Sequence, residues 1–187
     1  MRSYEGPLQA TREKNCTLAT LLADDCAMPV HQSVLELIGE TPIVQVQRLD
    51  TGCCELYLKL ESQNPGGSIK DRIGLSMIES AEKAGRIKPG DTLVEGTAGN
   101  TGIGLALVAQ QKGYKLILVV PDKMSREKIF NLKAMGAEVI LTRSDVAKGH
   151  PQYYQDLAQK IADDTPGACF INQFGNPDNP KAHALTT

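Results

Sequence analysis

The chain has 187 residues, a net charge of −2 at pH 7, 4% aromatic residues and no tryptophan. Acidic and basic residues are mixed along it, without the basic stripe of a nucleic-acid-binding protein, so we expect no nucleic-acid partner. No run of about 18 apolar residues is present, so no membrane span is predicted, while the length allows a domain with a substantial core.

The first 31 residues are mixed in charge and weakly patterned. We therefore expect a poorly ordered N-terminal extension over 1–31, followed by a folded domain over 32–187. Cys26 and His31 are two candidate metal ligands, too few for a metal site, so no metal site is predicted. Met28 precedes the first patterned segment, which leaves both Met1 and Met28 open as the start of the working protein.

Secondary-structure signals become regular from Ser33, which can cap a short helix over 34–38. Two strands are predicted over 43–46 and 55–60. A glycine-containing turn then leads into a helix that ends at Ala84. Further along, strands are predicted over 92–95, 115–120, 137–141 and 169–171, and helices over 101–111, 125–135 and 153–162.

This alternation of strands and helices predicts an α/β fold, an open parallel sheet with crossover helices. The helix over 101–111 is apolar on nearly every side, so it should lie in the interior. The sequence ends with a predicted loop over 176–180 and the first residues of a further segment over 181–187. The sheet therefore resembles part of a larger domain with an incomplete C-terminal part.

Lys70 lies in the segment 64–72, Asn-Pro-Gly-Gly-Ser-Ile-Lys-Asp-Arg. A tight turn is followed by Ser68 in the predicted N-cap position and by Lys70 in the first helical turn. A helix N-terminus carries partial positive charge, so it disfavours the ammonium form and favours the neutral amine of a Schiff-base lysine. An exposed lysine that extends its stem to water is the alternative, and the flanking glycines favour the first interpretation.

A second glycine-rich turn, Glu95–Gly102, joins a buried strand to the apolar helix. Backbone N–H groups at the helix start, with side-chain donors from Thr97, Asn100 and Thr101, predict a site for a carboxylate or a phosphate. A purely structural turn is one alternative. A dinucleotide loop with Asp122 on the ribose is another, although the glycine spacing is not that of the dinucleotide fingerprint.

Together these two turns resemble the signatures of the cysteine synthase and cystathionine β-synthase family, pyridoxal-phosphate enzymes of fold type II. The resemblance continues through 121–128 and 172–183 and covers nearly everything from Leu35 onward. It implies that Lys70 carries pyridoxal 5′-phosphate through a Schiff base and, once freed, removes the substrate α-proton. The implied ligands are Asn100 for the cofactor ring oxygen and, for the substrate carboxylate, Thr97, Gly99, Asn100, Thr101 and Gln173.

The implied reaction is β-replacement on L-serine or O-acetyl-L-serine by sulfide or homocysteine, giving cysteine or cystathionine. The resemblance also implies a homodimer and a mobile small subdomain over about 113–163. Ala98 departs from the serine usual in the family, which affects one carboxylate contact. Segments 124–128 and 143–155 resemble the cystathionine β-synthase branch slightly more.

Two further expectations concern compartment and completeness. The five cysteines, at 16, 26, 53, 54 and 169, lack C-x-x-C spacing and are typical of reduced thiols in a cytoplasmic protein. The Gly/Thr-rich loop with which the family binds the cofactor phosphate is not found within 187 residues. This implies an incomplete, weakly active or inactive piece. A non-catalytic binding fragment and a dinucleotide-dependent oxidoreductase stay open as alternatives.

Overall fold

The computed structural model describes residues 29–97 and 99–187. The predicted extension over 1–31 therefore falls almost entirely outside the described residues, as do Met28 and Ala98, and its expected poor order stays a prediction. Residues Gln32–Thr187 form one compact unit, which contains both glycine turns.

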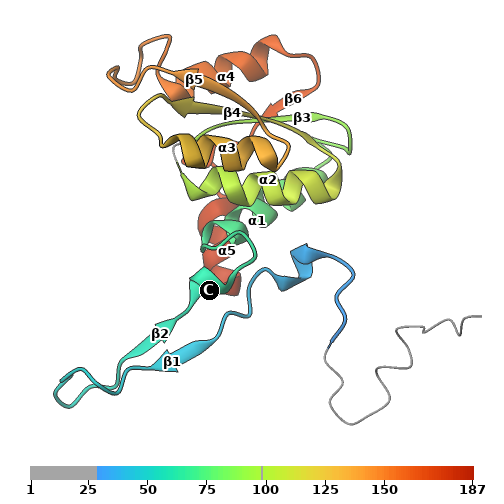
Figure 1. The fold of residues 1–187 in the computed structure, drawn as a ribbon. Coiled ribbons are helices and arrows are strands. Elements are labelled where there is room, and N and C mark those ends of the chain that lie inside the picture. The colour runs from blue at the N-terminus through green and yellow to red at the C-terminus, as the bar shows by residue number, and fades with distance from the viewer. Residues whose placement is uncertain (1–28, 98) are drawn as a thin grey trace, which may run out of the picture. The chain divides into compact units, whose positions relative to one another are not determined.

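The centre of this unit is a four-stranded parallel sheet with the strand order β5-β4-β3-β6 (Figure 1). The sheet confirms the predicted open parallel α/β architecture. Its inner strands are continuous apolar runs because helices cover both faces. The strands are β3 (Thr92–Gly96), β4 (Lys115–Pro121), β5 (Glu138–Thr142) and β6 (Ala168–Phe170).

Helices pack on both faces of the sheet (Figure 1). α4 covers one face, over Val94 and Val119, whereas α2 and α3 cover the other, over Leu118 and Val120, as the alternation of side chains along a strand requires. Within the described residues, no helix is long and apolar enough to cross a membrane. The helices are α1 (Lys70–Lys83), α2 (Asn100–Lys112), α3 (Arg126–Ala134), α4 (Tyr154–Asp164) and α5 (Asp178–Thr186).

α2 is the most enclosed helix of the fold, as its sequence predicts. It lies between the sheet and α1, with Leu105, Val108 and Ala109 buried (Figure 1). Gly113 ends it in the left-handed conformation, with its N–H donating to the carbonyl of Ala109. α1 and α5 lie beyond α2, so the start of α1 and the start of α2 belong to adjacent layers.

An N-terminal arm precedes α1. Its described part, residues 29–69, contains the 3-10 helices η2 (Val34–Leu37) and η3 (Glu61–Gln63) and the antiparallel hairpin of β1 (Ile43–Gln45) and β2 (Tyr57–Lys59). Ser33 caps η2 as predicted, because its hydroxyl accepts the N–H of Leu35. Both hairpin strands are shorter than the predicted runs and leave apolar side chains exposed, including Ile43 at 60% and Tyr57 at 52%.

The segment over 176–180 is a helix start, not the predicted loop. The side chain of Asn176 accepts the N–H of Asp178, and α5 begins there. Pro180 is accommodated in the first turn, where its missing N–H would have no intrahelical partner. Asn and Pro are common both in turns and at helix starts, so the amino-acid composition of this segment did not distinguish a loop from a helix start.

Candidate active site

The turn before Lys70 is held by partly buried hydrogen bonds. Gly67 has φ +80° and donates its N–H to the carbonyl of Asn64 at 2.8 Å. The Asn64 side chain accepts the N–H of Gly39 at 2.9 Å and donates to the carbonyl of Glu61. Asn64 therefore fixes the turn to the N-terminal arm, and glycine is required at 67 by its left-handed backbone.

Asp71 fixes the other side of the same turn. Its carboxylate accepts the N–H of Gly66, and a Cβ at 66 would collide with it. Burial raises the pKa of Asp71, which is fully buried, while the hydrogen bond from Gly66 opposes that rise. Its second oxygen, Oδ1, has no hydrogen-bond partner among the described groups. These contacts hold the chain in a tight turn immediately before α1.

α1 begins at Lys70, with Ile69 rather than the predicted Ser68 at the cap position. Ile69 already has helical angles, and the Ser68 hydroxyl accepts the N–H of Lys70 at 3.2 Å, so Ser68 still satisfies the first helical donor. The Lys70 side chain is partly buried. Burial first, and then the positive charges of Lys70 and Arg72, lower the pKa of His183 on α5.

A buried ion pair anchors α1 two residues after Lys70. Arg72 binds the Glu61 carboxylate with two hydrogen bonds, Nε to Oε2 at 2.7 Å and Nη2 to Oε1 at 2.8 Å. The exposed fractions of the two side chains are 2% for Arg72 and 16% for Glu61. Hydrogen bonding to Arg72 is the main cause that lowers the pKa of Glu61 to about 2. The pair joins the N-terminal arm to α1.

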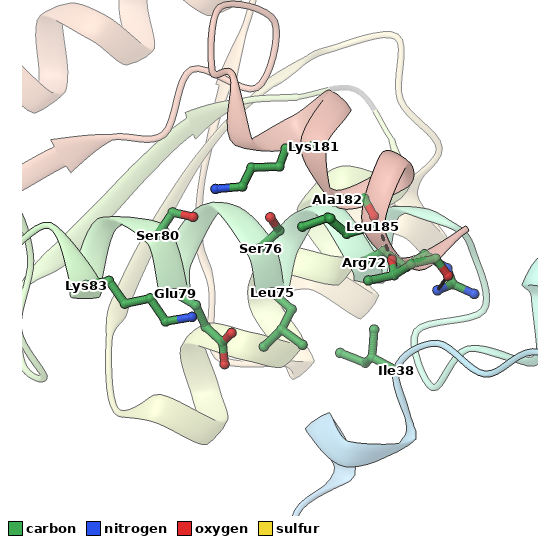
Figure 2. Close-up of a pocket in the computed structure, with 11 residues that line it drawn as sticks. Ile38, Arg72, Leu75, Ser76, Glu79, Ser80, Lys83, Lys181, Ala182 and Leu185 are labelled. Carbon is green, nitrogen blue, oxygen red and sulfur yellow. Dashed lines mark hydrogen bonds between the residues drawn. The ribbon is translucent and has the colours of Figure 1, made fainter.

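Arg72 also reaches α5, where it donates to the carbonyl of Thr186 (Figure 2). Beside this contact lies a groove of about 280 Å³ between α1 and α5. Its apolar lining includes Leu75 and Leu185, and its charged lining includes Glu79, Lys83 and Lys181 (Figure 2). Among the described residues that line it, none is a predicted site residue. The groove is therefore separate from the predicted site.

The second glycine turn follows β3 directly. Thr97 donates its N–H to the carbonyl of Val119, and its hydroxyl accepts the N–H of Gly99 at 3.3 Å. α2 then begins at Asn100, one residue before the predicted start, with Gly99 as its cap. Asn100 is exposed, whereas Thr97 and Thr101 are buried. The helix start therefore presents the Asn100 amide outward.

Gln173 lies beneath this turn. The Thr101 hydroxyl donates to Gln173 Oε1 at 2.7 Å, a contact between residues 72 positions apart in the sequence. Gln173 itself donates twice to Glu95, through its backbone N–H at 3.1 Å and through Nε2 at 3.3 Å. Asn172, with φ +53°, turns the chain after β6 so that Gln173 points back under the sheet end. Thr101 and Gln173 are therefore in direct contact.

Glu95 is a member of the site that we did not predict from the sequence. It is fully buried in β3, and burial raises its pKa to about 7, against the lowering effect of hydrogen bonds from Gln173. The available signal was a carboxyl group in a strand that must be covered on both faces of a parallel sheet. Such a group needs buried partners.

Lys70 and the second turn are brought together by two helical glycines. A Cβ on Gly104 would lie 2.6 Å from the carbonyl oxygen of Lys70, and one on Gly74 would lie 2.8 Å from the carbonyl carbon of Gly104. α1 and α2 therefore touch through their backbones. Asn100 precedes Gly104 by one helical turn, about 6 Å along the axis. The backbone at the start of α1 and the start of α2 are thus neighbours.

The side of the turn that faces α3 is nearly closed. Thr97 and Gly99 line a cavity of about 10 Å³, together with Met124 and Lys128. This volume admits about one water molecule. A ligand of amino-acid size at the turn therefore approaches from the side of Asn100 or displaces α3. The predicted motion of residues 113–163 stays a prediction.

The donor set fits an organic cofactor with anionic substituents. Lys70 supplies an amine, Asn100 an amide, and the first turn of α2 supplies backbone N–H groups and a positive dipole end. By contrast, the described part of the chain contains no group of three His, Cys, Asp or Glu side chains that could hold a metal ion. This combination suits carbonyl chemistry at Lys70 beside a bound carboxylate.

Sequence comparison identifies a matching family and individual relatives. The chain matches the family described as pyridoxal-phosphate dependent enzyme over residues 34–187. It is 46% identical over 186 residues to the cystathionine beta-synthase of Dictyostelium discoideum, covering 98% of this chain and 37% of that protein. It is 48% identical over 157 residues to the cysteine synthase of Staphylococcus aureus strain Mu50, covering 83% of this chain and 49% of that protein.

Solved structures agree with the sequence comparison. A hydrogen sulfide-producing enzyme from Fusobacterium nucleatum is 45% identical with a TM-score of 0.77, covering 85% of this chain and 51% of that one. O-ureido-L-serine synthase is 40% identical with a TM-score of 0.77, covering 84% and 49%. The chain spans less than half the length of the Dictyostelium and Staphylococcus proteins. It belongs to the pyridoxal-phosphate-dependent enzymes of fold type II, as a relative of cysteine synthase and cystathionine β-synthase.

Proposed function

We propose that the protein containing this chain catalyses pyridoxal-phosphate-dependent β-replacement on L-serine or O-acetyl-L-serine. Sulfide or homocysteine is the incoming thiol, and cysteine or cystathionine is the product. The observation that carries the proposal is the backbone contact of Lys70 with Gly104, which sets the start of α1 against the start of α2. Relatives named for sulfur amino-acid synthesis support the same chemistry.

Lys70 has two roles in this proposal. Its Nζ holds the cofactor, and once the substrate amine has displaced it, the same nitrogen takes the proton from the substrate α-carbon. Pyridoxal phosphate, when bound, supplies an electron sink for the pair released at that carbon. The exposed amide of Asn100 donates a hydrogen bond to the cofactor ring oxygen.

The substrate carboxylate binds at the second glycine turn in this proposal. The N–H groups of Asn100 and Thr101 precede the first intrahelical acceptor, whereas that of Gly102 donates to the carbonyl of Gly99 at 3.0 Å. The helix dipole favours an anion there. Thr97, Gly99 and Asn100 lie at this helix start and supply the groups that would bind the carboxylate. The Thr101 hydroxyl already donates to Gln173, so Thr101 offers the carboxylate its backbone N–H, and the Thr101–Gln173 pair borders the site. Holding the carboxylate directs the α-proton toward Lys70.

Product formation from defined substrate pairs tests this function. The full-length protein is incubated with each amino-acid donor and each thiol, and cysteine and cystathionine are measured by mass spectrometry. Lys70→Ala should abolish turnover. Lys83→Ala, which removes an exposed lysine at the other end of α1, should retain it. No product from any pair, or full turnover by Lys70→Ala, would reject the proposal.

A further inference from the structure

Glu95 makes two hydrogen bonds to one residue beneath the second glycine turn. Oε2 accepts the backbone N–H of Gln173 at 3.1 Å, and Oε1 accepts the side-chain Nε2 of the same residue at 3.3 Å. Two contacts to one residue fix both where Gln173 lies and how its side chain is turned. Glu95 is fully buried, so water does not compete for these donors.

These contacts define the direction of the Gln173 amide. Nε2 faces two acceptors, Glu95 Oε1 at 3.3 Å and the carbonyl of Gly96 at 3.4 Å. Oε1 must therefore point the opposite way, toward Thr101, whose hydroxyl donates to it at 2.7 Å. An inverted amide would place its NH₂ group against Thr101 and its oxygen against two other oxygens.

The chain of contacts leads from the sheet to the first turn of α2. Glu95 belongs to β3, Gln173 follows β6, and Thr101 is the second residue of α2. The backbone of Gln173 has one further anchor, because its carbonyl accepts the side-chain N–H of Asn179 at 2.7 Å. That bond holds the backbone, and the amide orientation depends on Glu95 and the carbonyl of Gly96.

We propose that Glu95 is a positioning residue of the carboxylate site. By accepting both N–H groups of Gln173, it holds the amide in the orientation that bonds Thr101 and keeps both side chains beside the start of α2. This inference rests on the proposed function, in which the substrate carboxylate binds at the start of α2, where the bonded pair of Thr101 and Gln173 lies. Glu95 itself touches neither substrate nor cofactor in this arrangement.

Glu95→Gln tests the proposal because it keeps the shape and replaces one acceptor by a donor. One of the two contacts then becomes donor against donor, and the Gln173 amide loses its fixed direction. In the full-length protein, we expect the Kd for L-serine, followed by cofactor absorbance, to rise roughly tenfold, the loss of one charge-assisted hydrogen bond. KM should rise similarly, with kcat little changed.

A double-variant cycle separates positioning from simple stabilisation. If Glu95 acts through Gln173, Glu95→Gln should raise the Kd no further in a Gln173→Ala background. Glu82→Gln is the matched control, since Glu82 accepts from Lys112 at 2.9 Å and from Tyr114 at 2.8 Å, in a contact that joins α1 to the end of α2. It should lower stability and leave the Kd unchanged.

Two results would overturn the inference. One is a Glu95→Gln protein that is less stable but binds L-serine normally. The other is an equal rise in Kd with and without Gln173. Glu95→Asp keeps a carboxyl group with a shorter reach and should give an intermediate Kd, which supplies the test if the glutamine variant does not fold. Failure of the unaltered protein to bind pyridoxal phosphate or any amino acid would reject the proposed function first.

Discussion

Replacing Gly104 by alanine tests the contact that sets Lys70 beside the start of α2. The new Cβ would lie 2.6 Å from the carbonyl oxygen of Lys70, 2.9 Å from its carbonyl carbon and 3.1 Å from Cα of Asp71. Ordinary contact begins near 3.4 Å, so α1 and α2 must separate by roughly 0.8 Å. All three atoms belong to the backbone, and no side-chain rotation relieves the overlap.

Two opposing effects decide how much Gly104→Ala changes the free energy of unfolding. Alanine inside a helix is normally about 1 kcal/mol more favourable than glycine. Overpacking a dense interior costs about 1–3 kcal/mol, and rigid backbone neighbours favour the upper part of that range. We therefore expect Gly104→Ala to lower the free energy of unfolding by about 1–2 kcal/mol. Because Lys70 moves away from Asn100, cofactor occupancy should fall as well.

Urea unfolding followed by circular dichroism measures the stability, and cofactor absorbance measures the occupancy. Gly102→Ala is the control on the same helix, with the same gain in helix propensity. Its Cβ would meet side-chain carbons of Thr97, Leu118 and Leu132 at 3.0, 3.2 and 3.3 Å, which can shift. Its free energy of unfolding should stay within about 1 kcal/mol of the unaltered chain. Equal behaviour of the two variants, or a stabilised Gly104→Ala, would refute the reasoning.

Three further predictions concern stability. The folded pKa of Glu95, about 7, exceeds its ordinary 4.5, so its contribution is complete below pH 4.5 and is lost as pH rises through about 7. The free energy of unfolding should fall by ~3 kcal/mol across that window, and urea titrations of Glu95→Gln should lack this slope. Arg72→Ala should lower the free energy of unfolding by ~3–5 kcal/mol and raise the pKa of Glu61 from about 2 toward 4.5. Carboxyl NMR titration measures that pKa, and an unchanged value would contradict the pairing. Ser125→Ala should lower the unfolding free energy by about 1 kcal/mol, because Ser125 caps α3 at Lys128, and Ser125→Asp should retain it in the same urea assay.

The order of the elements from α1 to β6 was predictable because the parallel strands are largely apolar runs and these helices are amphipathic or largely apolar, whereas the start of α5 was predicted as a loop. The run over 115–120 and the helix over 101–111 show this directly. Gly113 and the Ser125 cap also set helix ends from local chemistry alone. Two helix starts, at Ser68 and Thr101, shifted by one residue, where the backbone already had helical angles or a glycine served as the cap.

Contacts between distant segments could not be predicted in the same way. The pairing of Glu95 with Gln173 depends on the left-handed backbone of Asn172, which no periodicity reveals. The close backbone contact between α1 and α2 depends on Gly74 and Gly104, which are far apart in the sequence and meet only in the folded chain. Local pattern therefore located the two turns, and tertiary packing determined which of their side chains meet.

Attachment of the cofactor to one specific lysine is the most direct test of the central claim. The full-length protein is saturated with pyridoxal phosphate, reduced with borohydride, digested and analysed by peptide mass spectrometry. The proposed site predicts a single pyridoxyl modification, on Lys70, that is lost in Lys70→Ala and kept in Lys83→Ala. Modification of another lysine in its place, or no modification under saturating cofactor, would contradict the proposed site.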